Sequence, residues 1–128
     1  MIRPAGIGDI DALLALEEAL FDNAMSERML RYELENGRGW IYGDMFGYIL
    51  TRPDGALVDI VRLGVLPDHQ RKGIGQALLS RALLGVSDAV LTVKKDNLPA
   101  MKLYERWGFK VVAHLSGAGA FVMRRTLT

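Results

Sequence analysis

One stretch of the sequence decides how the chain must fold, Val65-Leu66-Pro67-Asp68-His69-Gln70-Arg71-Lys72-Gly73-Ile74-Gly75-Gln76-Ala77-Leu78-Leu79. An apolar strand runs into a loop with two glycines, and the loop runs directly into an amphipathic helix. Main-chain N–H groups at a helix N-terminus have no partner inside the helix, and the helix dipole adds partial positive charge there. Gly73 and Gly75 let an anion approach the backbone, and Arg71 and Lys72 place cations beside it. The pattern predicts a phosphate-binding loop.

Two common phosphate loops do not fit this stretch. A Walker loop ends in Gly-Lys-Ser or Gly-Lys-Thr, and neither Lys nor Ser follows Gly75. A dinucleotide-binding fingerprint needs a third glycine three residues after the second, where this chain has Leu78. The ligand is therefore expected to be a phosphate compound of another kind.

Outward from the loop, apolar periodicity and turn residues divide the rest of the chain into strands and helices. The expected strands are Met1–Pro4, Trp40–Tyr42, Met45–Thr51, Leu57–Leu66, Ala89–Lys94, Phe109–His114 and Ala120–Leu127. The first expected helix is capped by Asp9 or Asp11 and reaches Phe21. The other expected helices are Ser26–Asn36, Gly73–Leu84 and Asn97–Trp107. Turns are expected at Gly43–Asp44 and Pro53–Asp54–Gly55. The order β-α-α-β-β-β-α-β-α-β-β predicts an α/β (α+β) fold in which helices flank one mixed sheet, and residues 1–128 form a single domain.

Composition narrows the function. A formal net charge of +1 gives no broad basic surface, so no nucleic-acid partner is expected. The chain has no cysteine, and His69 and His114 lack the spacing of a metal site, so no metal is expected. No apolar run is long enough to cross a bilayer and no secretory leader is visible, so we expect a soluble cytoplasmic protein without a membrane partner.

A second motif follows the phosphate loop, Asn97-Leu98-Pro99-Ala100-Met101-Lys102-Leu103-Tyr104-Glu105-Arg106-Trp107-Gly108-Phe109. Helix structure explains much of it, because Asn97 or Asp96 can cap the helix and Gly108 can end it. Tyr104 is not needed for the helix, although a tyrosine at the edge of a core is a common alternative.

The two motifs together resemble the GNAT acyl-CoA transferases. Gln70-Arg71-Lys72-Gly73-Ile74-Gly75 is similar to the family's Gln/Arg-x-x-Gly-x-Gly/Ala loop, and 97–109 to its Asn-x-x-Ala-x-x-x-Tyr-x-x-x-Gly-Phe helix. The resemblance implies a mostly antiparallel central sheet and acetyl-CoA as cofactor. It also implies main-chain contacts from Leu63 and Val65 to the pantetheine arm, which Asn97 helps to hold. The implied pyrophosphate loop comprises Gln70, Arg71, Lys72, Gly73, Ile74, Gly75 and Gln76.

The chemistry of acetyl transfer to an amine needs an acid and a base. A neutral phenol with a pKa of about 10 can protonate the departing thiolate at pH 7, and the resemblance assigns this role to Tyr104. Asp59 lies in an apolar strand, where an unpaired carboxylate is costly. It is either a general base facing a wet cleft or the partner of a neighbour such as Arg62. Some family members carry a Glu or His base where this chain has Thr92, which cannot act as one, so Asp59 or an ordered water remains.

Within the family the chain looks most like the RimI type, which acetylates the N-terminal amine of ribosomal proteins. Gly64–Gly73 and Ala118–Arg124 carry this resemblance, whereas Thr92 and the short hairpin around Ser116–Gly119 depart from it. The sequence predicts an N-acetyltransferase acting on a primary amine, of either a protein N-terminus or a small molecule. A non-catalytic acyl-CoA-binding module is the alternative, and both a monomer and a homodimer are compatible with the sequence.

Overall fold

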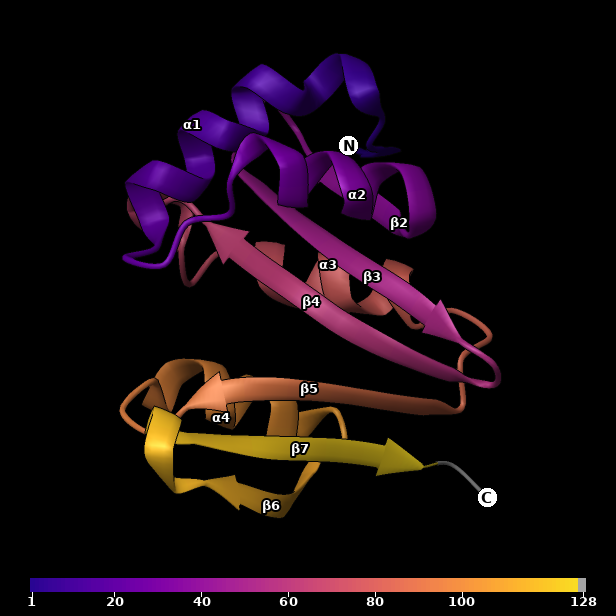
Figure 1. Ribbon diagram of the computed structural model, residues 1–128, viewed down its shortest axis with the longest axis vertical. Helices are drawn as coiled ribbons and strands as arrows, with labels where there is room; N and C mark the ends of the chain where they lie inside the picture. Colours follow the sequence, from indigo (N-terminus) through magenta and orange to yellow (C-terminus); the bar gives the residue numbers. More distant parts are fainter. Residues whose placement is uncertain (127–128) are drawn as a thin grey trace.

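The computed structural model describes residues 1–126 and shows one seven-stranded sheet with helices on both faces (Figure 1). The strands are β1 (Ile2–Pro4), β2 (Arg38–Tyr42), β3 (Gly47–Asp54), β4 (Leu57–Val65), β5 (Asp88–Lys94), β6 (Lys110–Leu115) and β7 (Ala120–Thr126). The α-helices are α1 (Ile10–Leu20), α2 (Glu27–Asn36), α3 (Ile74–Ala82) and α4 (Leu98–Arg106), with short 3₁₀ turns at Ile7–Asp9, Pro67–His69 and Ser116–Ala118. The predicted fold class and order of elements are confirmed.

The strands follow one another across the sheet in the order β1-β2-β3-β4-β5-β7-β6. Within residues 1–126, β4 and β5 are parallel and the other neighbouring strands are antiparallel. The predicted end of the last strand at Leu127 lies outside the described residues.

The hairpin between β3 and β4 differs from its prediction. The strand continues through Pro53 to Asp54, and the turn lies at Gly55, which has φ 63°. Proline is tolerated there because β2 pairs with β3 only as far as Thr51, so the missing N–H of Pro53 can face an open edge. At the other end β3 begins at Gly47 rather than Met45, because Met45 takes a left-handed φ of 64°.

The two faces of the sheet carry separate cores. Helices α1 and α2 lie in front of β3 and β4 in Figure 1, and α3 and α4 lie behind the sheet. The core under α1 and α2 contains Leu13, Leu16, Leu30, Ile41, Tyr48 and Leu50. The core under α3 and α4 contains Ile49, Ile60, Leu78, Leu79, Leu91, Tyr104, Phe109 and Met123. No described helix covers the front of β5, β7 and β6, which stays open.

Strand β4 leaves β5 part-way along its length. The two strands pair only from Leu57 to Ile60, opposite Asp88–Leu91. At the same point the register between β3 and β4 shifts, because Leu50 faces Arg62 while Thr51 faces Ile60. The extra residue, Val61, makes a β-bulge, which bends a strand and increases its twist. The ends of β4 and β5 therefore diverge, as Figure 1 shows.

Candidate active site

The loop that follows β4 approaches α3 through two left-handed residues. Arg71 has φ 63°, which is uncommon for a residue with a side chain, and Gly73 has φ 79° and ψ 9°. Alternation of left-handed and ordinary conformations turns successive main-chain N–H groups toward one side, which makes an anion-binding concavity. This backbone shape is compatible with the predicted phosphate loop, whose ligand stays a prediction.

The N-terminus of α3 is left open for a ligand. Gly73 is the N-cap and provides no side-chain hydrogen bond, and the first main-chain bond in the helix runs from the Ala77 N–H to the Gly73 carbonyl. The N–H groups of residues 74–76 come before that bond and have no acceptor in the helix. A Cβ built on Gly73 would meet no atom within 4 Å beyond its chain neighbours, so the N-cap position is not crowded. The N–H groups of residues 74–76 can donate to an anion, and the phosphate loop stays a prediction.

Gly75 has a different role from Gly73. A Cβ at this position would lie 3.4 Å from Cδ2 of Leu103 and 3.9 Å from Cγ2 of Val65. These are ordinary van der Waals distances, so the start of α3 packs against α4 and the end of β4 with room for a methyl group. This close packing brings the phosphate loop, the diverging strand and the helix of the second motif together.

Three contacts anchor the loop and the residues that lead into it. The Gln70 side chain donates a hydrogen bond from Nε2 to the Val65 carbonyl at 3.0 Å, which ties the loop to the end of β4. The His69 ring stacks on Phe46 with the ring centroids 3.9 Å apart and an angle of 12° between the planes. The Leu66 N–H also donates to the Phe46 carbonyl at 2.9 Å. The sequence did not reveal the contribution of Phe46, because the residue lies in a distant hairpin.

The helix of the second motif carries Tyr104 into the core. The Tyr104 side chain is only 7% exposed, and its ring meets Phe109 edge-on with the centroids 5.8 Å apart. Burial raises the pKa of the Tyr104 hydroxyl to about 12, so the phenol is neutral at pH 7. Asn97 is exposed and caps α4, because its Oδ1 accepts a hydrogen bond from the Ala100 N–H at 3.3 Å.

Asp59 lies on β4 immediately before the divergence. It is half-buried and faces Arg52 of β3, which places both side chains on the α2 side of the sheet. Arg52 is nevertheless bonded to Glu33 of α2, through Nε at 3.1 Å and through a second, short contact from Nη2. Burial raises the pKa of the Asp59 carboxyl, Arg52 lowers it, and Glu33 and Asp54 raise it further.

The predicted alternative, an ion pair between Asp59 and Arg62, is wrong. Arg62 binds Glu17 of α1 instead, with Nε and Nη2 at 2.9 and 2.8 Å from its carboxylate oxygens. No hydrogen bond from residues 1–126 reaches the Asp59 carboxylate. The exposed Thr92 lies on β5, at the front of the sheet, and adds no ionisable group there.

Comparison with known protein families identifies the family to which this chain belongs. The acetyltransferase (GNAT) domain family matches residues 34–111, which include the phosphate loop, the diverging strands and the helix with Tyr104. The chain belongs to the GNAT acetyltransferase family. The resemblance that the two motifs predicted is confirmed.

Several GNAT proteins are similar to this one. The mycothiol acetyltransferase of Clavibacter sepedonicus is 34% identical over 111 residues, which are 83% of this chain and 33% of that protein. The N-alpha-acetyltransferase of Sulfurisphaera tokodaii is 27% identical over 98% of this chain and 92% of that protein. The crystal structure of the ribosomal-protein-S18-alanine N-acetyltransferase from Escherichia coli has the same fold, with a TM-score of 0.85 and 23% identity over 100% of this chain and 95% of that one.

The matches differ in how much of each relative they include. This chain spans about a third of the length of the mycothiol acetyltransferase and nearly all of the Sulfurisphaera protein.

Within the described part of the chain, no helix is both long enough and apolar enough to cross a bilayer.

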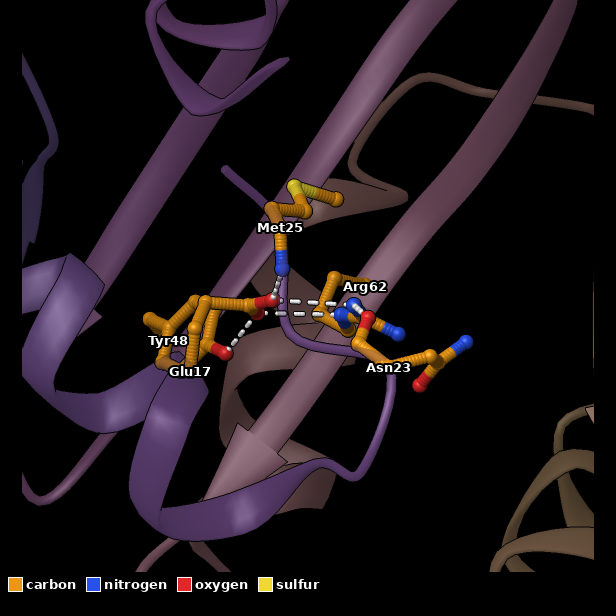
Figure 2. Close-up of polar contacts among 5 residues, drawn as sticks. All are labelled: Glu17, Asn23, Met25, Tyr48 and Arg62. Atoms are coloured by element: carbon orange, nitrogen blue, oxygen red, sulfur yellow. Dashed lines mark hydrogen bonds and ion pairs between the residues drawn. The ribbon is translucent and has the colours of Figure 1, made fainter. Parts of the chain in front are cut away.

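A buried charge on α1 escaped the sequence analysis. Glu17 is fully buried and accepts hydrogen bonds from the Met25 N–H, Tyr48 and Arg62 (Figure 2). A signal was present, because position 17 falls on the apolar stripe that Leu13 and Leu16 define at helical spacing. A glutamate on such a stripe predicts a buried partner of opposite charge.

Proposed function

We propose that this GNAT protein is an acetyl-CoA-dependent N-acetyltransferase that moves the acetyl group to a primary amine. The observation that carries the proposal is the divergence of β4 from β5 after Ile60, beside an α3 N-terminus that has no side-chain cap. Beyond Ile60, β4 has main-chain groups that β5 does not pair and that an extended arm would bond. The helix N-terminus would attract its phosphates, and α4 would carry an acid to the same region.

Acetyl-CoA supplies the thioester from which the acetyl group leaves. The loop amides of Gln70, Arg71, Lys72, Gly73, Ile74, Gly75 and Gln76 would hold its pyrophosphate. The main-chain groups of Leu63 and Val65 would bind the pantetheine arm, because β5 does not pair with β4 beyond Ile60. The Asn97 amide would help to hold the same arm, in addition to capping α4.

Two side chains would move protons. Tyr104 holds its proton at neutral pH because burial raises its pKa to about 12, so its hydroxyl can donate to the departing sulfur. Asp59 would accept the proton that the attacking amine loses. Its carboxylate is suited to this task because Arg52, which lies opposite it, is bonded to Glu33. An ordered water relaying the proton to Asp59 is compatible with the same geometry.

A protein N-terminal amine is the acceptor that we favour. Two N-terminal acetyltransferases, from Sulfurisphaera and Escherichia coli, are similar to this chain over nearly its whole length. An α-amine has a pKa of about 8, against about 10.4 for lysine, so it needs less help from a base. A small-molecule amine is the second candidate, because the mycothiol acetyltransferase is 34% identical over the region that it shares with this chain.

Release of free thiol from acetyl-CoA tests the proposal. The panel contains peptides that begin with alanine, polyamines, amino acids and aminoglycosides, and mass spectrometry locates the acetyl group on each product. We expect thiol release with one class of amine only. Binding of coenzyme A without transfer to any amine would instead identify a non-catalytic acyl-CoA-binding module.

A further inference from the structure

The Glu17 carboxylate links α1 to three other parts of the molecule (Figure 2). One oxygen accepts from the Met25 N–H at 2.8 Å and from Arg62 Nη2 at 2.8 Å. The other accepts from Arg62 Nε at 2.9 Å and from the Tyr48 hydroxyl. The side chain of Glu17 is 0% exposed, so these donors replace water completely.

Arg62 extends the same network to the turn that joins α1 to α2. Its Nη2 also donates to the Asn23 carbonyl at 3.0 Å, and its guanidinium carbon lies 4.1 Å from the centre of the Phe21 ring. Together with the bond from Met25 to Glu17, three contacts therefore end on residues 21–25, which we call the α1–α2 turn. Tyr48 reaches Glu17 from β3 and makes no hydrogen bond to this turn.

The bulge in β4 makes these contacts possible. Because Val61 is the extra residue, Arg62 faces Leu50 on the side of the sheet that α1 and α2 cover. The bulge is also the point at which β4 leaves β5. The network thus joins the α1–α2 turn to the place where the two strands diverge.

A buried ion pair of this kind contributes little net stability, because the loss of hydration offsets the attraction between the charges. Its bidentate geometry instead holds the carboxylate and the guanidinium in one relative orientation. In this protein that orientation fixes the α1–α2 turn against β4. Stability alone is therefore a weak explanation for the Glu17–Arg62 pair.

We propose that Glu17 and Arg62 are positioning residues that hold the α1–α2 turn beside the opening between β4 and β5, on the side from which the amine arrives. This inference rests on the proposed function. The phosphate loop and Tyr104 belong to the α3 and α4 side of the sheet. An amine must therefore approach the thioester from the opposite side, which the turn borders.

Two single variants separate positioning from simple stabilisation. Arg62→Lys keeps a positive charge near Glu17. A lysine ammonium cannot bind both oxygens of the Glu17 carboxylate and the Asn23 carbonyl at the same time, as the Arg62 guanidinium does. Tyr48→Phe removes one bond to the same carboxylate and leaves every contact to the turn. If Arg62→Lys lowers the population of the ordered turn to about a tenth, KM for the amine rises about tenfold. We expect kcat and the affinity for coenzyme A to stay unchanged, and Tyr48→Phe to reduce thermal stability without raising KM.

Hydrogen exchange provides a readout that needs no acceptor. In Arg62→Lys, the Met25 amide, which donates to Glu17, should exchange at least about tenfold faster, because the open population rises as the ordered one falls. The same amide should be unaffected in Tyr48→Phe. Should Arg62→Lys not fold, the double variant Glu17→Met with Arg62→Met removes both charges together and should show the same faster exchange and higher KM.

Equal KM values in Arg62→Lys and the wild type, with unchanged exchange in the turn, would overturn the proposal. A KM that rises equally in Tyr48→Phe would also overturn it, because the carboxylate would then act only on stability. If the wild type acetylates no amine in the panel, the proposed function fails, and hydrogen exchange alone decides whether the network holds the turn.

Discussion

Replacing Gly73 with alanine tests the phosphate loop most directly. Gly73 has φ 79° and ψ 9°, and an added Cβ would meet no atom within 4 Å. The methyl group therefore causes no clash, but a left-handed conformation costs an alanine about 1–2 kcal/mol. We expect the free energy of unfolding to fall by that amount while the fold is kept.

The effect of the same change on coenzyme A should be larger than this strain. Gly73 directly precedes the N–H groups of residues 74–76, which are proposed to bind the pyrophosphate, so an added methyl and a strained loop should cost at least one of these hydrogen bonds. Each hydrogen bond to a charged group contributes about 1.5–3 kcal/mol. Losing one of them should weaken the binding of coenzyme A about ten- to hundredfold.

Gly55→Ala is a matched control. Gly55 has φ 63° and an equally open Cβ position, but it lies in the turn between β3 and β4. Both variants should lose similar stability in urea unfolding, and only Gly73→Ala should lose affinity in calorimetry with coenzyme A. Equal affinities for the two variants would refute the assignment of the pyrophosphate to this loop.

Three further substitutions test the proton-transfer groups. Tyr104→Phe should lower kcat about 10²- to 10⁴-fold without changing coenzyme A affinity, as steady-state kinetics and calorimetry can show. Burial raises the pKa of the Asp59 carboxyl, so ionisation of Asp59 costs the folded state free energy that it does not cost the unfolded chain. Asp59→Asn should therefore stabilise the fold at pH 7, lose that gain as pH falls through the raised pKa, and abolish the acidic limb of kcat/KM. Glu33→Gln should free Arg52 to pair with Asp59, which lowers the pKa of Asp59 in a carboxyl-carbon NMR titration. An unchanged titration would contradict the role given to Glu33.

Local chemistry explains why the phosphate loop could be predicted from the sequence. The helix N-terminus, the two glycines and their spacing all lie within residues 70–76, so no distant contact is needed to form the concavity. Gly75 shows the limit of this approach. Its neighbours Leu103 and Val65 could not be read from the motif, because only the packing of α3 on α4 brings them close to it.

The partners of the buried charges could not be predicted in the same way. Successive residues of a regular strand point to opposite faces of the sheet, so two residues three apart, such as Asp59 and Arg62, point to opposite faces. They share a face only if a bulge between them adds a residue. The bulge at Val61 places Arg62 toward α1, and the register places Arg52 opposite Asp59. Both facts depend on how β3 and β4 pair over their whole length, and no short motif records that pairing.

The pattern of these charges explains how a strand aspartate can remain available as a base. Two arginines, Arg52 and Arg62, face the same side of the sheet as Asp59, and Arg52 lies directly opposite it. Each is instead bonded through two nitrogens to a buried glutamate, Glu33 on α2 or Glu17 on α1. The bidentate geometry commits both guanidinium groups to the helices. Glu33 therefore influences Asp59 without touching it, because it holds the hydrogen bonds of Arg52, which acts on the Asp59 carboxylate only through its charge.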